Sequence, residues 1–396
     1  MDLSYGQEYE DFRQEVRDFL NEHWGTVSGS KPSGKDIASF RQLAIDRGYL
    51  YRHVPRHLGG SEQPADSLRA QVIAEEFTKA RAPREVSGNG VSMVVPTLLD
   101  RAEDWQKERF IPKTVSGEYR WAQGYSEPGS GSDLASLRTR GERVGDEWVI
   151  NGQKIWTSDA QNCQYMYTLV RTEPDAPKHA GISYLLVPLD QPGIEIRPLK
   201  QITGTAEFNE VFLNDARTPA DWIVGKRGEG WQVSRTTLRH ERNAIGSRSE
   251  GLYASLLKLM KGATLDGRPA LQDPVIRERM AALEAFVWAQ RYSSYYQTTC
   301  HLKGRDPGIL QMMNKLLTTE TQAEIAQLAL EVIGDAGTLA PFDETGKPRG
   351  DERWMNQFMG SLGIAIAGGT SNIQRNIIAE RGLGLPRDAS ADRSGS

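Results

Sequence analysis

The first 120 residues carry apolar side chains at the spacing of amphipathic helices. Tyr9, Phe12, Val16 and Phe19 recur every three or four positions, and Leu20 widens the same stripe. Stripes of the same period follow, with Gly and Pro between them. We therefore expect helices in this part of the chain, at residues 8–24, 68–79 and 105–112.

The pattern changes at about Trp121. Runs of β-branched and aromatic residues occupy 148–150, 165–170 and 182–187, with turn signals such as Gly145-Asp146 between them. Helical periodicity returns at Gly230 and continues to about Gly382, with loops expected at 262–274 and 334–350. The stretch between the two helical parts contains no Gly-x-Gly-x-x-Gly and no P-loop.

This order predicts an α+β protein in which a β-domain is inserted between helical parts. We expect an N-terminal α-helical domain at 1–120 and a central antiparallel, β-barrel-like domain at 121–229. A C-terminal helical bundle should follow at 230–387, and the small polar residues 388–396 should form a disordered tail.

Composition excludes several classes of function. A net charge of −4 with mixed signs gives no electrostatic case for nucleic-acid binding. Cys163 and Cys300 cannot build a disulfide framework and lack metal-ligand spacing, so we expect reduced thiols in a cytoplasmic protein. The sequence shows no signal peptide, and no apolar run approaches the roughly 20 residues of a membrane span.

Two neighbouring polar stretches are the strongest candidates for a binding site. Residues 125–133 (YSEPGSGSD) combine a proline, two glycines and several hydrogen-bonding side chains, which favours close approach of a flat ligand to the backbone. Residues 151–158 (NGQKIWTS) begin with a turn signal and then present an indole and two hydroxyls. The pair suits a planar, polar ring, and the alternative is two surface turns of a β-domain.

Glu241 is the candidate for an acid–base residue. It shares a predicted helix face with Trp231, Ser234, Leu238 and Ile245, and no basic residue lies three or four positions away. A carboxylate on such a stripe requires a distant partner or a function. Three interpretations follow: a catalytic base, a buried Glu paired with a distant Arg, or an exposed Glu.

Four stretches, in this order, resemble the acyl-CoA dehydrogenase family: YSEPGSGSDL, GDEWVINGQKIWTS, ITGTAEFNEVFLNDARTP and GTSNIQRNIIAERGLGLPR. The resemblance runs from the first helix to Arg387. It implies the helix–strand–helix fold and FAD as the cofactor. The implied reaction is α,β-dehydrogenation of an acyl-CoA, with electrons passing to an electron-transfer flavoprotein.

The resemblance also assigns roles to individual residues. Tyr125 and Ser126 would contact the flavin ring, Trp156 would flank it, and Ser158 would approach N5. Ser132 would meet the pantetheine arm of coenzyme A. A buried β-domain aromatic is the alternative for Trp156. Near the C-terminus, Thr370 and Asn372 would hold the flavin pyrophosphate at a helix start, where Thr370 could also serve as a simple N-cap.

The position of the base required for α-proton removal is unusual in this chain. Many family members carry a Glu before the Gly-Thr of the last motif, where this sequence has Gly368. Some branches place the base in the earlier helix, and Leu238-Arg-His-Glu-Arg242 matches that context. The resemblance therefore implies Glu241 as base, Arg242 at the substrate, and the backbone N–H of Gly368 as a donor to the thioester oxygen.

Two departures indicate a mixed oligomer. No Arg occupies the family's pyrophosphate-gripping position in 262–267, and Asp335 places a negative charge in the loop that takes a neighbour's dinucleotide. These features resemble the actinobacterial mixed-subunit (α₂β₂) acyl-CoA dehydrogenases that act on steroid or other bulky thioesters. We expect a homo- or hetero-tetramer with a homologous subunit. The alternatives are a non-catalytic partner subunit, or an oxidase or monooxygenase on the same scaffold.

Overall fold

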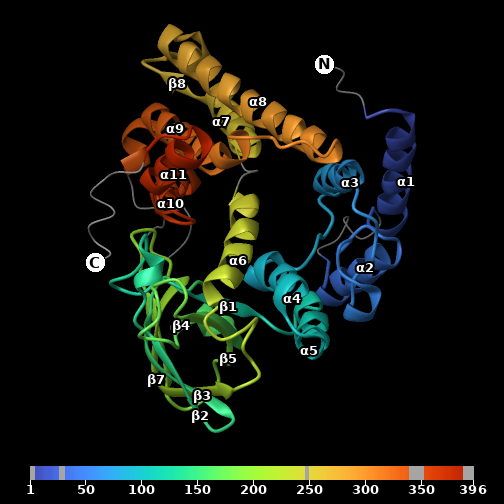
Figure 1. The fold of residues 1–396 in the computed structure, drawn as a ribbon. Helices are drawn as coiled ribbons and strands as arrows, with labels where there is room; N and C mark the ends of the chain where they lie inside the picture. Colours follow the sequence, from blue (N-terminus) through green and yellow to red (C-terminus); the bar gives the residue numbers. More distant parts are fainter. Residues whose placement is uncertain (1–4, 26–31, 246–248, 339–351, 387–396) are drawn as a thin grey trace. The chain divides into compact units, whose positions relative to one another are not determined.

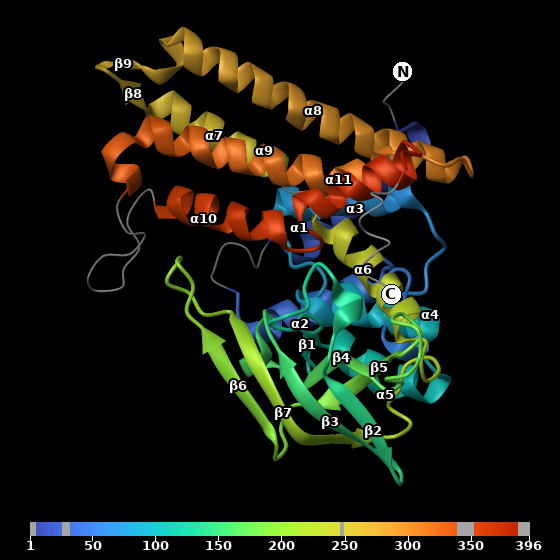
Figure 2. The ribbon, with the colours of Figure 1, turned by 60° about the vertical axis from the view of Figure 1, so that its left-hand side comes forward.

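The computed structural model describes residues 5–25, 32–245, 249–338 and 352–386, and it describes their side chains except at 241–245, 301, 338, 352 and 353. The predicted tail at 388–396 lies outside the described residues. The chain forms two compact units. The first comprises Met1–Leu199 and Glu207–His240, and the second comprises Lys200–Ala206 and Glu241–Ser396. Figure 1 and Figure 2 show the ribbon, coloured along the sequence.

Helices make up the N-terminal part of the first unit. They are α1 (Gln7–His23), α2 (Gly34–Asp46), α3 (Ser67–Ala80), α4 (Val95–Arg101) and α5 (Asp104–Val115), and a one-turn π-helix, η2 (Gly90–Val94), leads into α4. Ser33 begins α2 with a capping box, in which Asp36 and Ser33 satisfy each other's backbone N–H. The stripe predicted for the first helix is confirmed as the buried face of α1, which includes Phe12, Val16, Phe19 and Leu20.

Seven strands follow in one sheet: β1 (Trp121–Gly124), β2 (Arg140–Val144), β3 (Glu147–Lys154), β4 (Tyr165–Arg171), β5 (Ile182–Pro188), β6 (Ile194–Leu199) and β7 (Phe208–Pro219). Their order is β1-β4-β2-β3-β7-β6, and β5 pairs with β4. The predicted antiparallel pairing holds for β2–β3, β3–β7, β4–β5 and β6–β7. The pairing of β1 with β4 is parallel, as is the single contact between β2 and β4.

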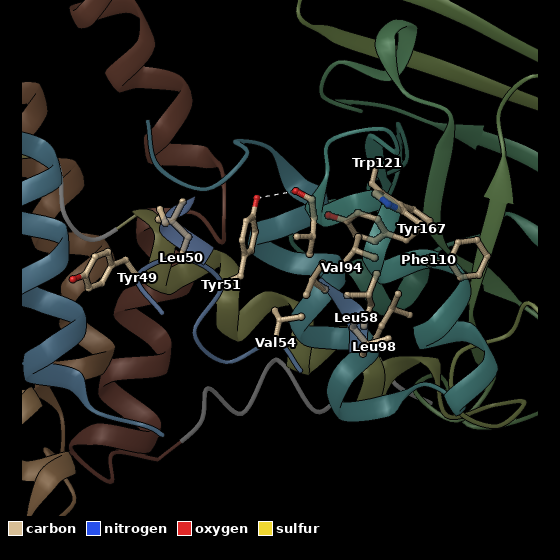
Figure 3. Close-up of a cluster of buried hydrophobic side chains, with 14 of the residues drawn as sticks. Tyr49, Leu50, Tyr51, Val54, Leu58, Val94, Leu98, Phe110, Trp121 and Tyr167 are labelled. Atoms are coloured by element: carbon tan, nitrogen blue, oxygen red, sulfur yellow. Dashed lines mark hydrogen bonds between the residues drawn. The ribbon is translucent and has the colours of Figure 1, made fainter. Parts of the chain in front are cut away.

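The sheet has a buried core on each face, because side chains alternate along its strands. Tyr167 and Leu169 of β4 belong to the cluster that includes the N-terminal helices, whereas Met166 and Val170 belong to a second cluster enclosed by the strands. Figure 3 shows the first cluster, where Tyr167 and Trp121 of the sheet lie beside helix residues. This shared core fixes the N-terminal helices on the sheet.

Helix α6 (Gly230–Ile245) confirms the predicted helix after the sheet. Its buried face differs from the predicted stripe. Val233, Ser234 and Thr237 are buried, whereas Trp231 and Leu238 are half-buried at its edge. The Thr237 hydroxyl lies 3.0 Å from that of Thr97 in α4, which ties the two helices together.

The described part of the second unit is mainly helical and includes one hairpin. It contains α7 (Ser249–Gly262), α8 (Pro274–Leu302), α9 (Leu310–Ile333), α10 (Glu352–Ile366) and α11 (Ser371–Ile377). Helix α9 contacts the other four, and it contributes many of the buried residues of this unit (Figure 2). The stretch 262–274, predicted as a loop, contains a short hairpin of β8 (Thr264–Leu265) and β9 (Arg268–Pro269). Its turn residues Asp266 and Gly267 have φ of 50° and 78°.

Candidate functional site

The polar loop at 125–133 is closed on itself and tied to the end of β3. Glu127 and Ser130 exchange backbone hydrogen bonds of 2.9 and 3.0 Å, and the Ser130 hydroxyl donates to the carbonyl of Asp133. The carbonyl of Ser126 accepts a 2.9 Å hydrogen bond from the backbone N–H of Ile155. The structure thus brings the two polar stretches of the sequence side by side.

A buried ion pair lies behind this loop. The Nζ of Lys154, which is 0% exposed, donates to Glu127 Oε1 at 2.8 Å and to the carbonyls of Leu169 and Tyr125. The Glu127 carboxylate also accepts from the backbone N–H groups of Arg138 and Thr139, at 2.6 and 2.9 Å. One carboxylate and one ammonium therefore join the loop to β3, β4 and the segment before β2.

The two charges respond differently to their burial. Burial lowers the pKa of Lys154 to about 8, although Glu127 opposes this shift. Burial alone would raise the pKa of Glu127, but Lys154 and the hydrogen bonds to the carboxylate outweigh it and hold that pKa below its ordinary value. Glu127 therefore remains a carboxylate at neutral pH and sustains the network.

Trp156 lies two residues after Lys154, and its side chain is exposed. Its side chain is 58% exposed, it contacts the ring of Phe208, and its φ is +60°. A bulky residue in the left-handed region costs roughly 1–3 kcal/mol and occurs mainly where the surrounding structure imposes it. The exposure excludes the alternative of a buried core aromatic. A strained, exposed indole on a rigid support is typical of a ligand-binding wall.

Gly129 and Gly131 of the loop also indicate a ligand-binding surface. Gly129 and Gly131 do not have positive φ values, and a Cβ added at either position would meet no protein atom within 4 Å. Neither backbone conformation nor internal packing requires glycine there. A cavity of about 350 Å³ opens beside this loop. Close approach of a ligand to the backbone would explain why glycine, which has no Cβ, occupies both positions.

The other predicted site residues of the first unit differ in how far their side chains are buried. The Tyr125 ring is buried and packs against Tyr167 and Tyr184, with centroids 5.8 and 6.3 Å away. Tyr125 can therefore contribute mainly through its backbone. Ser158 is half-buried, and Ser132 is exposed.

The predicted C-terminal residues lie in the second unit, in the turn between α10 and α11 and in the first turn of α11. Gly368 and Gly369 have φ of 62° and 92°, so the turn uses conformations that suit glycine. Thr370 accepts a hydrogen bond from the N–H of Ile373, which confirms that it is an N-cap. Asn372 is exposed in the first turn of α11.

Two polar side chains hold this glycine turn. Lys315 of α9, 2% exposed, donates to the carbonyl of Gly369 at 2.9 Å and to that of Ala365 at 3.3 Å. Gln374 donates to the carbonyl of Gly368 at 3.1 Å. Because a peptide is planar, fixing these carbonyls also fixes the direction of the next N–H groups.

The predicted base and its neighbour fall at the edge of the described structure. Glu241 and Arg242 lie within α6, but their side chains are outside the described residues. The roles of both therefore stay predictions.

A larger cavity of about 530 Å³ lies in the first unit beside the last described turn of α6. Its wall includes Val91 and Ser92 of η2, His53, Glu85 and, from α6, His240. Sequence reasoning did not identify this cavity, because its lining comes from three segments that are far apart in the chain.

Lys154, Glu127 and Lys315 were also missed. A signal was present for Lys315, which lies in an apolar helical stretch and has no acidic residue three or four positions away. Lys154 and Glu127 lay inside the two polar stretches, but nothing local shows that residues 27 positions apart pair.

Some classes of site have no support in the described part of the chain. No described helix is long and apolar enough to cross a membrane. The described residues also contain no group of three or more His, Cys, Asp or Glu side chains that could hold a metal ion.

Comparison with known protein families matches three successive domains of one family. The acyl-CoA dehydrogenase N-terminal domain matches residues 6–118, the middle domain 122–216 and the C-terminal domain 228–383. These matches cover most of the chain, and the helix–strand–helix order of the structure agrees with them.

Individual relatives agree with the family match. The chain is 39% identical to acyl-CoA dehydrogenase IpdE1 of Mycobacterium tuberculosis, over 97% of this chain and 99% of that protein. Among solved structures, the ChsE4–ChsE5 complex of M. tuberculosis matches at 29% identity with a TM-score of 0.76, over 98% of this chain and 100% of that chain. The steroid ACAD Tcur3481–Tcur3483 matches at 28% identity and the same TM-score, with the same coverage. This chain therefore belongs to the acyl-CoA dehydrogenase family of oxidoreductases.

Proposed function

We propose that this chain catalyses FAD-dependent α,β-dehydrogenation of an acyl-CoA thioester and passes the electrons to an electron-transfer flavoprotein. The observation that carries the proposal is Trp156, an exposed indole in a strained conformation beside the Ser126–Ser130 loop. The half-buried residues Ser126 and Ser158 and the open backbone at Gly129 and Gly131 fit a flat, polar ring system. Bound there, FAD would supply a hydride acceptor.

Each residue has a distinct part in this proposal. Trp156 would flank the ring, the backbone of Tyr125 and the hydroxyls of Ser126 and Ser158 would orient it, and Thr370 and Asn372 would hold its pyrophosphate. Ser132 would contact the pantetheine arm of the substrate. The buried pair of Lys154 and Glu127 would keep the loop and the end of β3 in register while ligands come and go.

Glu241 would remove the α-proton, with Arg242 at the substrate. The negative charge that develops on the thioester oxygen requires a fixed donor, and we assign the backbone N–H of Gly368 to this role. Lys315 donates to the carbonyls of Ala365 and Gly369, and Gln374 donates to that of Gly368, so the turn keeps its shape although two glycines form it. Losing a side chain at 368 leaves this backbone donor in place.

The relatives support a proposal for the acyl group and for the assembly. A chain 28% identical belongs to a protein named as a steroid ACAD, and another belongs to a two-protein complex. We propose a bulky, ring-bearing acyl-CoA and a tetramer that includes a homologous subunit. Exposed Trp288, Tyr292 and Tyr296 recur at helical spacing on α8, which supports packing of that face against another subunit.

The proposal is tested by the flavin spectrum and by Glu241→Gln. The purified protein, alone and with its homologous partner, should show flavin absorbance that bleaches on addition of a ring-bearing acyl-CoA. Glu241→Gln should retain flavin and lose at least two orders of magnitude in turnover, because a positioned base typically contributes that much. Glu195→Gln, at an exposed ion pair with Arg197, is the matched control and should keep full turnover. Full turnover in Glu241→Gln would remove it from the mechanism, and sustained turnover with peroxide production, when oxygen is the only acceptor, would indicate an oxidase.

A further inference from the structure

The buried pair of Glu127 and Lys154 surrounds the backbone of Ser126, a residue proposed to contact the flavin ring. Lys154 Nζ lies 2.8 Å from Glu127 Oε1 and 3.3 Å from the carbonyl oxygen of Tyr125. Tyr125 and Glu127 are the two neighbours of Ser126 in the chain. One ammonium therefore holds the carbonyl before Ser126 and the side chain after it.

These contacts set the direction of a backbone donor. A peptide group is planar, and its C=O and N–H point in opposite directions. Because the Tyr125 carbonyl points to Lys154, the N–H of Ser126 points away from the ammonium. The carbonyl of Ser126 accepts a 2.9 Å hydrogen bond from the N–H of Ile155. The peptide groups on both sides of Ser126 are thus fixed.

Three backbone donors remain available around the exposed indole. The N–H groups of Ser126, Trp156 and Ser158 donate to no acceptor in the described part of the chain. The N–H groups of Ile155 and Thr157, which alternate with them along the chain, are bonded to backbone carbonyls. A polar ring bound here can accept hydrogen bonds from the available donors, and the buried pair fixes the direction of the one at Ser126.

The pair also places two opposite charges where water does not reach. The Lys154 side chain is 0% exposed and that of Glu127 is 8% exposed, so their charges are screened less than charges at the surface. Arg171 of β4 is a further charge nearby: burial lowers its pKa, and Glu127 opposes that shift. Removing either member of the pair changes the net charge behind the loop by one unit while the other member stays ionised.

We propose that Glu127 and Lys154 are positioning residues that set the reduction potential of the flavin bound at Ser126 and Trp156. A hydride brings two electrons and one proton, so a flavin that accepts one gains a negative charge. An excess positive charge behind the loop favours the reduced flavin, and an excess negative charge disfavours it. The intact pair keeps the potential between these extremes. This inference rests on the proposed FAD-dependent dehydrogenation.

The test measures the midpoint potential of the FAD-loaded protein by reductive titration against reference dyes, in the assembly that retains FAD. Glu127→Gln is compared with Glu127→Gln/Lys154→Met at pH 5.5, because loss of the carboxylate lowers the pKa of Lys154 further below about 8. Lys154→Met is compared with the same double variant at pH 8.5. There the carboxylate stays ionised although it has lost the ammonium that helps to lower its pKa.

The two single variants should shift the potential in opposite directions. Relative to the double variant, Glu127→Gln should favour the reduced flavin at least tenfold, and Lys154→Met should disfavour it at least tenfold. For a two-electron couple, these changes correspond to potentials about 30 mV higher and about 30 mV lower. A purely structural role would not produce shifts of opposite sign.

Glu147→Gln is the matched control. It removes a carboxylate from strand β3, but Glu147 and its partner Arg217 are about half exposed, so the potential should stay within about threefold of the native balance. Far-ultraviolet circular dichroism would show that each variant is folded. If Glu127→Gln does not fold, Lys154→Met and the double variant still test the carboxylate, because they differ only at residue 127.

The outcomes separate the two proposals. Shifts of the same sign in both single variants, or balances within about threefold of the double variant, would overturn the assignment to the pair and leave the dehydrogenation standing. Opposite shifts in a protein that oxidises no acyl-CoA would sustain the role of the pair and refute the proposed reaction. A protein that retains no FAD, alone or with its homologous partner, would overturn both.

Discussion

Glu127→Gln removes one charge from the buried pair beneath the polar loop and leaves the shape of the side chain nearly unchanged. In the native protein, Glu127 Oε1 lies 2.8 Å from Lys154 Nζ, and Lys154 is fully buried. The substitution leaves the buried ammonium with neutral acceptors only, among them the carbonyls of Tyr125 and Leu169. It also turns an amide N–H₂ toward one of the two backbone N–H groups that the carboxylate accepts, those of Arg138 and Thr139.

Breaking one side of a buried ion pair typically costs about 3–5 kcal/mol. The clash with a backbone donor belongs to the same rearrangement, so we do not add it separately. At roughly 2–4 °C per kcal/mol for a unit of this size, the apparent Tm should fall by about 6–20 °C. Circular dichroism at pH 7.5 would record the transition, and urea unfolding followed by tryptophan fluorescence would give the free energy of unfolding.

The matched control is Glu147→Gln on strand β3. Glu147 pairs with Arg217 at 2.7 Å, but both side chains are about half exposed, so the loss should stay below about 1 kcal/mol. The double variant Glu127→Gln/Lys154→Met should be more stable than Glu127→Gln alone, because it removes the unpaired charge. A Glu127→Gln protein within 1 kcal/mol of the native one would refute the assigned role of the pair.

Three further outcomes are expected. The pKa of Lys154 is lowered to about 8 from an ordinary 10.5, so the unfolded chain binds the proton more tightly. The free energy of unfolding should therefore rise between pH 8 and 10.5, by up to roughly 3 kcal/mol from this group. Urea unfolding at a series of pH values should show this rise in the native protein and not in Lys154→Met. Lys315→Met removes the donor to Gly369 and should lower kcat more than it raises KM, and an unaltered kcat in a folded variant would contradict this role. Trp156→Ala should weaken FAD binding at least tenfold by fluorescence titration and leave the circular dichroism spectrum unchanged, since the indole is 58% exposed; equal affinity would exclude it as a wall of the flavin site.

The order of helices and strands could be predicted from the sequence because it depends on local periodicity. The stripe of Phe12, Val16 and Phe19 can be buried only on one face of a helix. The nearly continuous apolar runs of β4 and β5 suit strands with a core on each side. The short hairpin at 264–269 was missed although its Asp-Gly turn was visible, because two-residue strands have almost no periodicity. The prediction placed the buried face of α6 part of a turn away from where it lies. The reason is that neighbouring residues such as Thr97 of α4 determine which side of the helix is packed.

For the site, the sequence by itself determined which residue types are available: a loop that exposes backbone, a tryptophan and serines beside it, and a glycine pair at the start of the last helix. Only the tertiary structure decided that Lys154 and Glu127 meet, that Trp156 points outward in a strained conformation, and that Lys315 holds the glycine turn. The physical reason is that burial and charge pairing depend on atoms brought together across the fold. Local sequence patterns report which faces are apolar, but they carry no information about which distant polar groups will satisfy one another.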